Sequence, residues 1–290
     1  MKDTIEILKE ITLNEKIYTV SINEEFLLTG GTSKNFYKIF YHEDKDNIKI
    51  ECQHQKSIRS SFIQDDFYGC ASYDGTATIF HNNEYLDIIE GPETEIKSLA
   101  MSPDKKYIGL PTRGKTLWLC VNNNNSFEID SIVEDHHQDI KGVKFHKNKI
   151  YTYSYDNTLK IYIIESGLEL IQSIELQSTI WSIVVTDKNI FTAEENGTIS
   201  KYTMNDKGIY ILEKKEILSY YPIYSITRIK DYIAIISNRN NILLLDFDLQ
   251  IIEIKENEGT EDINEINSYN ELLVTGGDDG KVIIYKLNNK

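Results

Sequence analysis

The sequence predicts an all-β protein, a seven-bladed β-propeller whose ring is closed by its N-terminal strand, and three observations predict it. A segment made of an apolar strand, a turn of Asp, Asn or Gly and an alternating strand recurs seven times. A further strand precedes every copy, and an orphan segment, Thr4–Thr12, precedes the first. The copies end at Phe40, Phe80, Cys120, Tyr162, Tyr202, Asp246 and Tyr285, at steps of 39 to 44 residues. Repeats of this length built from strands are the mark of propeller blades.

The apolar pattern of the repeats excludes a helical repeat protein. The seven copies span residues 29–40, 70–80, 110–120, 152–162, 192–202, 237–246 and 275–285. Apolar residues within them alternate with a period of two, whereas helical repeats of similar length would show a period of 3.6. A period near 40 with turn residues at fixed offsets is typical of WD40-type propellers.

Each repeat opens with an isoleucine that begins its first strand. These residues are Ile17, Ile58, Ile96, Ile140, Ile180, Ile223 and Ile263. A β-branched residue is therefore expected at one packing position all round the ring. Outer-strand candidates lie between the copies, for example at 48–53, 85–89 and 168–174. These complete the four strands that a propeller blade needs.

The two ends of the chain predict how the ring closes. The seventh repeat has no outer strand after Tyr285, and Thr4–Thr12 has no blade of its own. An unpaired outer edge would be an aggregation liability. We therefore expect Thr4–Thr12 to pair with Lys281–Tyr285. Because no linker rich in Pro, Gly or Ser interrupts the repeats, residues 1–290 are expected to form one domain.

Cysteine usage and targeting signals indicate a cytosolic or nuclear protein. The chain shows no secretory signal and no apolar run long enough to span a membrane. Its three cysteines, Cys52, Cys70 and Cys120, fall in different repeats and lack CxxC spacing or a histidine at ligand distance. We expect them to be buried, unreactive thiols that form neither a disulfide framework nor a metal site. The purified protein is accordingly expected to bind no metal, cluster or other cofactor.

The net charge of −15 argues against nucleic acid as a partner, because phosphates would be repelled at long range. The acidity is concentrated between residues 246 and 265, where only Lys255 opposes the acids. The acidic residues there are Asp246, Asp248, Glu253, Glu256, Glu258, Glu261, Asp262 and Glu265. This region is either a solvated outer edge and loop between blades six and seven or a docking surface for a basic partner.

No catalytic constellation is recognisable. His54 and His136 each lie four residues before a first-strand isoleucine, where a WD40 repeat carries a histidine that hydrogen-bonds within the blade. The neighbouring His136 and His137 would point to opposite faces of a strand, which disfavours a shared metal. The chain has no Walker loop, no GxGxxG and no GxSxG motif. We therefore expect a protein that is not an enzyme.

Two repeated offsets predict a basic and aromatic cluster at the mouth of the central channel. One offset precedes the turn residue of each copy, and the other follows the first-strand isoleucine. In blades two to five they supply Arg59, Lys97, Arg113 and Lys141 with Tyr73, Tyr155 and Trp181. The residues are either a solvated channel mouth or a site for an acidic peptide that contains aromatic residues. Arginine suits the second interpretation, because it binds carboxylates through two hydrogen bonds and stacks on rings.

Blades three to five resemble the WD40 subunit of the cytosolic iron–sulfur protein assembly (CIA) targeting complex. Residues 113–118 (RGKTLW) align with the family's R-D-K-S-V-W segment, and residues 136–141 (HHQDIK) align with H-T-Q-D-V-K. Residues 179–182 (TIWS) and 278–280 (DDG) also fit the family. The chain departs from the family at Gly114, which replaces the turn aspartate, and at Cys120, which replaces the closing tryptophan.

This resemblance implies an adaptor that holds no cluster. Such a protein joins other subunits of the targeting complex to apo iron–sulfur proteins, whose acidic-aromatic tails it binds, and Arg113 falls on the family's exposed functional arginine. It implies a monomer within a hetero-complex, in the cytoplasm and also the nucleus, with no membrane or nucleic-acid partner. The alternative is another intracellular WD40 scaffold, such as a nuclear-pore or coat component or a ubiquitin-ligase substrate receptor.

Overall fold

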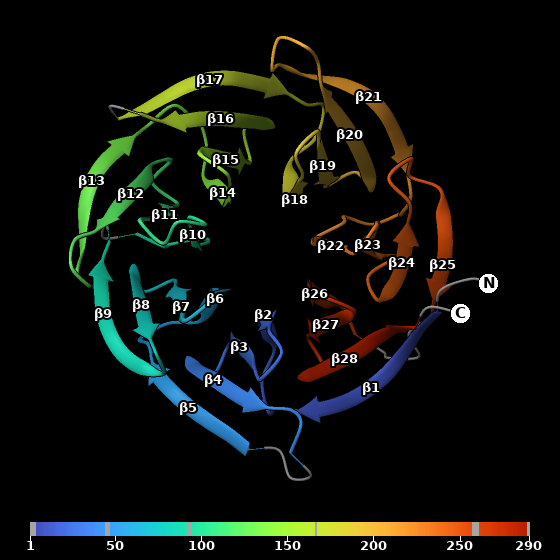
Figure 1. Ribbon diagram of the computed structural model, residues 1–290. Coiled ribbons are helices and arrows are strands. Elements are labelled where there is room, and N and C mark those ends of the chain that lie inside the picture. Colours follow the sequence, from blue (N-terminus) through green and yellow to red (C-terminus); the bar gives the residue numbers. More distant parts are fainter. Residues whose placement is uncertain (1–3, 44–46, 92–93, 166, 257–260, 289–290) are drawn as a thin grey trace.

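Seven four-stranded antiparallel sheets form a ring (Figure 1). The structure is a computed structural model that describes residues 4–43, 47–91, 94–165, 167–256 and 261–288. These residues contain no helix, and hence none that is long and apolar enough to cross a membrane. The prediction of an all-β, seven-bladed β-propeller is confirmed.

Each blade consists of consecutive strands, except that the last blade takes its outer strand from the start of the chain. Blade one comprises β2 (Ile17–Ile22), β3 (Leu27–Gly31), β4 (Asn35–Phe40) and β5 (Asn47–Gln53), and blade two comprises β6 (Ile58–Gln64), β7 (Phe67–Ser72), β8 (Thr76–His81) and β9 (Glu84–Glu90). Blade three comprises β10 (Ala100–Met101), β11 (Tyr107–Pro111), β12 (Leu117–Asn122) and β13 (Phe127–Val133). Blade four comprises β14 (Ile140–His146), β15 (Lys149–Ser154), β16 (Thr158–Ile164) and β17 (Leu168–Glu175). Blade five comprises β18 (Ile180–Val185), β19 (Asn189–Glu194), β20 (Thr198–Met204) and β21 (Tyr210–Ile217). Blade six comprises β22 (Ile226–Ile229), β23 (Tyr232–Ser237), β24 (Asn241–Leu245) and β25 (Ile251–Lys255). Blade seven comprises β26 (Ile263–Tyr269), β27 (Leu272–Gly277), β28 (Lys281–Asn288) and β1 (Thr4–Thr12).

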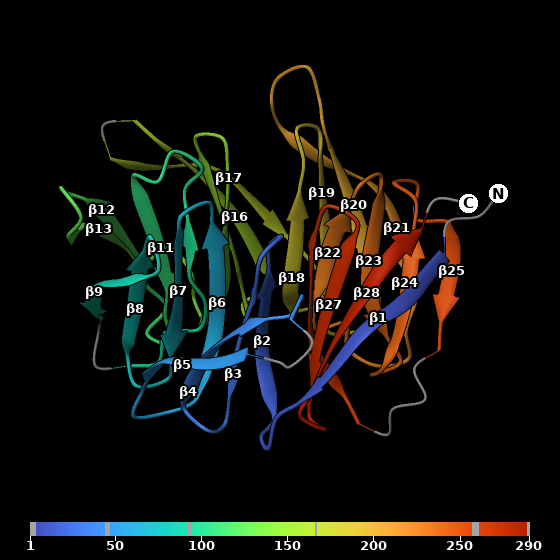
Figure 2. The same cartoon turned by 60° about the horizontal axis from the view of Figure 1, so that its bottom comes forward.

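The ring closes as the sequence predicts. Strand β1 pairs antiparallel with β28, from Thr12 opposite Lys281 to Thr4 opposite Asn288, with a register shift after Ile7. Figures 1 and 2 show β1 in blue beside β28 in red. The turn at Gly280 supports this pairing: its φ is +77°, and a Cβ there would lie 2.1 Å from the Leu13 carbonyl oxygen. Glycine meets both conditions without strain.

The core of the ring lies between neighbouring blades. All six residues of β7 are buried, whereas most residues of the outer strand β5 are exposed. Side chains of adjacent blades meet in the gap, as where Phe26 of blade one packs edge-to-face on Tyr68 of blade two, 5.7 Å between ring centroids. Each blade thus buries its faces against two neighbours, which a ring provides for all seven.

The first-strand isoleucines are buried anchors, as predicted. Their exposed fractions run from 0% for Ile17 and Ile58 to 6% for Ile263. In blades one, two, four, five and seven, the strand pairing skips the residue that follows the isoleucine, which forms a bulge. A bulge re-aims a side chain. This is how the residues after the isoleucines point toward the channel.

Blades three and six depart from the predicted first strand. In blade three, Ile96 makes only an isolated bridge to Thr112, and β10 begins at Ala100. Pro111 stands in β11 where the ladder needs a backbone N–H, and proline has none. In blade six, β22 begins at Ile226, because Ser225 is engaged by the next blade: its hydroxyl lies 3.1 Å from the nitrogen and 3.2 Å from the oxygen of Ile266.

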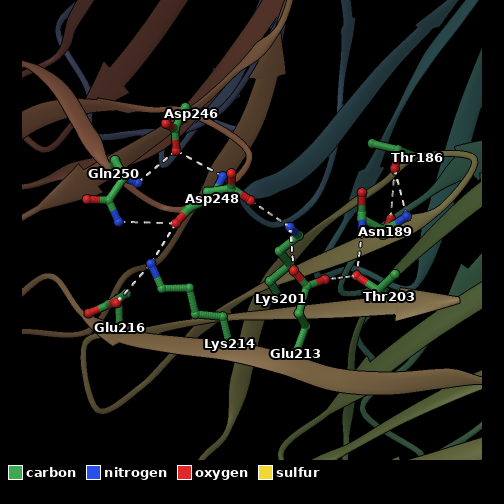
Figure 3. Close-up of polar contacts among 10 residues, drawn as sticks. All are labelled: Thr186, Asn189, Lys201, Thr203, Glu213, Lys214, Glu216, Asp246, Asp248 and Gln250. Atoms are coloured by element: carbon green, nitrogen blue, oxygen red, sulfur yellow. Dashed lines mark hydrogen bonds and ion pairs between the residues drawn. The ribbon is translucent and has the colours of Figure 1, made fainter.

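A polar network joins the outer parts of blades five and six (Figure 3). The ammonium of Lys201, a side chain only 8% exposed, donates to Glu213 Oε1 at 3.0 Å and to Asp248 Oδ1 at 3.1 Å. Lys214 donates to the backbone oxygen of Asp248 at 2.7 Å. Asp246 shapes the same turn by accepting from the backbone nitrogens of Asp248 and Gln250. The network fastens β21 to the turn before β25.

Much of the acidic region 246–265 holds the fold together. Besides Asp246 and Asp248, both carboxylate oxygens of Glu253 accept from the Ile5 nitrogen at 3.1 Å, which ties β25 to β1. Glu265 accepts from the Val20 nitrogen at 2.8 Å. Glu256 and Glu261 are exposed, and Glu258 lies outside the described residues. Less of the negative charge is therefore free for a basic partner than the sequence alone suggests.

Candidate functional site

The predicted basic and aromatic residues of blades two to five converge at one end of the channel. Arg59, Lys141 and Trp181 are bulge residues after first-strand isoleucines, and Lys97 occupies the same offset in blade three. Tyr73 and Tyr155 are the first residues after β7 and β15. All six are half-buried. We call these residues the channel-mouth cluster: Arg59, Tyr73, Lys97, Lys141, Tyr155 and Trp181.

Lys141 is the centre of the cluster. Its ammonium lies 3.7 Å from the Trp181 ring centroid and 5.3 Å from that of Tyr155. The two rings meet edge-to-face at 5.8 Å. Burial lowers the pKa of Lys141 well below its usual value, and the charges of Arg59 and Lys97 lower it further. A carboxylate ligand would favour the charged form of Lys141, as the nearby charges of Glu195 and Asp139 already do.

Arg113, which the repeated offsets group with these residues, lies on the rim of the channel-mouth cluster. Its side chain is 61% exposed, and its guanidinium lies 3.3 Å from Glu95 Oε1. Glu95 also accepts from Lys97 at 2.6 Å, so this carboxylate joins Arg113 to the cluster through Lys97. Burial disfavours ionised Glu95, but the hydrogen bond from Lys97 and the charges of Lys97 and Arg113 lower its pKa overall.

A small cavity opens among the cluster residues. Its volume is about 80 Å³, and its lining includes Arg59, Lys97, Lys141, Trp181 and Tyr224. Lys97 lies 4.8 Å from the Tyr73 ring centroid, so a cation stands over an aromatic face here too. Arg59 donates to the Tyr18 backbone oxygen at 3.0 Å, which holds the guanidinium at the channel. The cavity accommodates a small charged or planar group, such as a carboxylate or the edge of a ring.

Acidic and aromatic residues complete the site, and two of them, Glu195 and Tyr224, stand at the same two offsets in blades five and six. Asp139 lies 4.0 Å from Lys97, and Glu195 accepts a hydrogen bond from the Trp181 indole nitrogen. Tyr224 packs edge-to-face on Trp181 at 4.7 Å. The offset just before the first-strand isoleucine, which holds Glu95 and Asp139, was the signal that could have identified these acids. Net positive charge at the site is therefore smaller than four cations suggest.

His54 and His136 have the structural role predicted for them. His136 Nδ1 donates to Asp156 at 2.9 Å, while the Thr152 hydroxyl lies 2.8 Å from Nε2. His54 Nδ1 faces Asp74 at 3.0 Å in the same way. Both imidazoles are buried and tie the loop before the first strand to the turn after the second. Neither lies in the channel.

The prediction that the cysteines are scattered, with no histidine at ligand distance, is wrong. Cys52 Sγ lies 3.9 Å from Cys70 Sγ, and Cys70 Sγ lies 3.4 Å from His54 Nε2. Cys52 belongs to β5 of blade one and Cys70 to β7 of blade two, so packing between adjacent blades brings the two thiols together. Cys120 is buried, and burial raises its pKa to about 12. Only this third thiol matches the expectation of an isolated, unreactive cysteine.

Comparison with known proteins agrees with the resemblance noted in blades three to five. The chain is 29% identical over 85 residues to the probable cytosolic iron-sulfur protein assembly protein 1 of Botryotinia fuckeliana, a match that covers 26% of this chain and 20% of that protein. The protein of the same name from Sclerotinia sclerotiorum is also 29% identical, over 26% of this chain and 19% of its own length. Both relatives are named for cytosolic iron–sulfur protein assembly. No family model matches the chain.

The relatives are matched over about a fifth of their length, so their similarity covers a minority of each chain. What extends over the full ring is the seven-bladed architecture. The names of the relatives and the geometry of the channel mouth are separate observations, because the geometry is read from this chain alone.

Proposed function

We propose that this protein is a non-catalytic adaptor of cytosolic iron–sulfur protein assembly that binds acidic-aromatic tails of apo-protein clients at its channel mouth. The observation that carries the proposal is the position of Lys141, stacked on Trp181 and flanked by Arg59 and Lys97. The names of the two relatives supply the cellular process.

The chemistry of the channel-mouth cluster suits a ligand with both a carboxylate and a ring. A ligand carboxylate can take the place of Glu95 at Lys97 and Arg113, because the present contacts of 2.6 and 3.3 Å are made by a flexible side chain. An aromatic side chain can stack beside Trp181 and Tyr224, whose rings already meet edge-to-face. Cations above aromatic faces contribute roughly 0.5–2 kcal/mol each, more when water is excluded.

The proposal includes partners and compartment. The protein acts in the cytoplasm, and also in the nucleus, as a monomer within a hetero-complex with other subunits of the targeting complex. It binds neither nucleic acid nor membrane. Isolation of the tagged protein from its own cells should recover iron–sulfur assembly factors and apo iron–sulfur proteins; recovery of coat or ubiquitin-ligase subunits instead would contradict the proposed process.

Charge reversal at Arg113 is expected to weaken binding of a client tail more than tenfold. The exposed Arg113 side chain can take up a ligand carboxylate, and loss of a charge pair that becomes desolvated costs on the order of 2–5 kcal/mol. Lys141→Gln should weaken binding by at least as much, because it removes the central cation. A labelled peptide with acidic residues beside a terminal aromatic residue, titrated by fluorescence anisotropy, gives the affinities. Binding by the wild type should also weaken as salt is added.

Lys207 supplies the matched control. It is an exposed lysine in the loop between β20 and β21, outside the channel-mouth cluster, and Lys207→Glu should leave peptide affinity within twofold of wild type. Arg113→Glu should change the free energy of unfolding by no more than about 0.5 kcal/mol, the usual range for surface positions. Equal affinities for wild type, Arg113→Glu and Lys141→Gln, with all three folded, would place the client site elsewhere.

A further inference from the structure

Three metal-ligating side chains meet between blades one and two. The ligand atoms of Cys52, His54 and Cys70 all lie within 4.8 Å of one another. His54 and Cys70 are buried and Cys52 is half-buried. The three come from two blades, so anything that binds all of them also joins β5 of blade one to blade two. The channel-mouth cluster does not include these residues.

The hydrogen bonds of His54 place the lone pair of Nε2 on the side of the sulfurs, where the Thr78 hydroxyl also approaches it at 3.1 Å. The Thr76 hydroxyl donates to Asp74 Oδ1 at 2.7 Å, so its oxygen can only accept from His54 Nδ1, 3.0 Å away. Nδ1 also faces Asp74 Oδ2 at 3.0 Å, and two acceptors require that Nδ1 carry the proton. Nε2 of the neutral ring is then the acceptor that faces Cys70. A carboxylate behind a histidine is the arrangement that orients metal-ligating imidazoles.

Two of the three ligand separations match the edges of a zinc tetrahedron, and the third, between Cys52 and His54, is within 4.8 Å. With Zn–S of about 2.3 Å and Zn–N of about 2.0–2.1 Å, tetrahedral geometry places two sulfurs about 3.8 Å apart and a sulfur and a nitrogen about 3.6 Å apart. The corresponding separations here are 3.9 Å for Cys52 and Cys70 and 3.4 Å for Cys70 and His54. A disulfide would require the two sulfurs to approach to about 2.05 Å, nearly 2 Å closer than they are.

Blade four shows what the same framework does without sulfur. There His136 occupies the position of His54, Asp156 that of Asp74, and Thr152 that of Cys70. The Thr152 hydroxyl satisfies His136 Nε2 at 2.8 Å. Glu134 stands two residues before His136, as Cys52 stands before His54. Around His54, two thiols therefore stand where blade four has a hydroxyl and a carboxylate, while the Thr78 hydroxyl approaches His54 Nε2 from a different position.

From this geometry we propose that Cys52, His54 and Cys70 bind one Zn²⁺ ion between blades one and two. Thiolate and imidazole are the donors that zinc prefers, and three protein ligands with a fourth position are an established coordination pattern. The Thr78 hydroxyl, 3.1 Å from His54 Nε2, lies next to the fourth position. Both thiols lose their protons to the solvent on binding. The ion fastens the outer strand of blade one to its neighbour.

Metal titration of the full chain tests the site. Protein purified in reductant is freed of metal with a chelator, desalted, and titrated with Zn²⁺ in competition with a chromophoric chelator. We expect one equivalent to bind. Titration with Co²⁺ alone should give a thiolate-to-metal charge-transfer band and the intense visible bands of a tetrahedral site. Zinc should also raise the melting temperature of the wild type.

Substitutions distinguish a zinc site formed by these three side chains from zinc binding elsewhere on the protein. Cys70→Thr introduces the residue that blade four has at this position, so blade two should still fold. Cys70→Thr and Cys52→Ser should each weaken zinc binding by more than about 100-fold. Both variants should also lose the visible Co²⁺ bands. Asp74→Asn should weaken it about 10- to 100-fold, the usual effect of losing a group that orients a ligand. Cys120→Ser is the matched control and should bind like the wild type.

Two results would overturn the proposal. The first is zinc affinity that is the same in wild type, Cys52→Ser and Cys70→Thr, because binding would then occur elsewhere. The second is the absence of zinc binding by the reduced protein together with a Cys52–Cys70 disulfide, found by peptide mapping, in protein purified without reductant. None of these measurements involves a client peptide, so failure here leaves the channel-mouth proposal untouched.

Discussion

A chain without residues 1–12 is expected to be insoluble or to melt far below the full-length protein. Strand β1 supplies eight paired positions to β28, and its removal uncovers the whole edge of that strand. Ile5 and Ile11, 2% and 3% exposed, would be lost from the core, at roughly 1.5–3 kcal/mol each. An open edge also recruits other chains. Thermal unfolding and sedimentation of the truncated and full-length proteins measure the effect.

Point changes within β1 isolate the packing contribution. Ile11→Ala should reduce the free energy of unfolding by about 2–5 kcal/mol, because the side chain is buried against blade one and β28. Leu8, in the same strand, is 52% exposed, and Leu8→Ala should change it by no more than about 0.5 kcal/mol. Urea denaturation gives both values. A truncated chain with an unchanged melting temperature would refute the role of β1 in closing the ring.

Asp156→Ala is expected to destabilise the protein by about 3–5 kcal/mol, the cost of removing one member of a buried charged network. Asp156 accepts hydrogen bonds from His136, from the His137 nitrogen at 2.8 Å and from Thr158 at 2.6 Å. Its loss leaves these donors without the carboxylate in a site where the side chain of His136 is fully buried. Chemical denaturation at pH 7 measures the change.

The pH dependence of this loss identifies its cause. Burial opposes ionisation of Asp156, but hydrogen bonds from Thr158, His137 and His136 outweigh it and lower its pKa to about 2. A carboxylate with a lowered folded-state pKa stabilises the protein above its unfolded pKa of about 3.9, and the contribution disappears as pH falls toward 2. The difference in the free energy of unfolding between wild type and Asp156→Ala should therefore be largest at pH 7 and should shrink below about pH 4.

Asp206 provides the control for this experiment. It is an exposed aspartate in the loop between β20 and β21, and Asp206→Ala should leave stability within about 0.5 kcal/mol at every pH. Asp74→Ala removes the equivalent carboxylate of blade two, and its effect should add to that of Asp156→Ala, since the two networks share no residue. A pH-independent loss in Asp156→Ala would mean that packing, not the carboxylate charge, accounts for the destabilisation.

Local pattern was sufficient to predict the ring. The isoleucine frame and the turn residues repeat in every blade, and Thr4–Thr12 was the unpaired segment left over, so its pairing followed from the need to cover an edge. The short first strand of blade three was also within reach, because Pro111 in the adjacent strand cannot donate a backbone hydrogen bond. These features depend on neighbours within one sheet.

The functional residues were harder to place because their contacts cross between sheets. Sequence offsets identified Lys141, Lys97 and Arg113 as neighbours, but the bulges that turn residues inward are visible only in the strand register. The contact of Arg113 with Glu95, which holds it on the rim, likewise had no signal in the repeated offsets. The approach of Cys52 to Cys70 depends on how one sheet rotates against the next, for which a single sequence has no local signal.

The closing pair β1 and β28 has a consequence for how the protein is made. During synthesis β1 emerges first, and its partner from Lys281 onward emerges last. At translation rates of about 5–20 residues per second, β1 waits roughly 15–55 s with its backbone unpaired. Throughout that time the nascent chain exposes an aggregation-prone edge on the ribosome. The ring should therefore gain its final stability only after β28 has emerged and paired with β1.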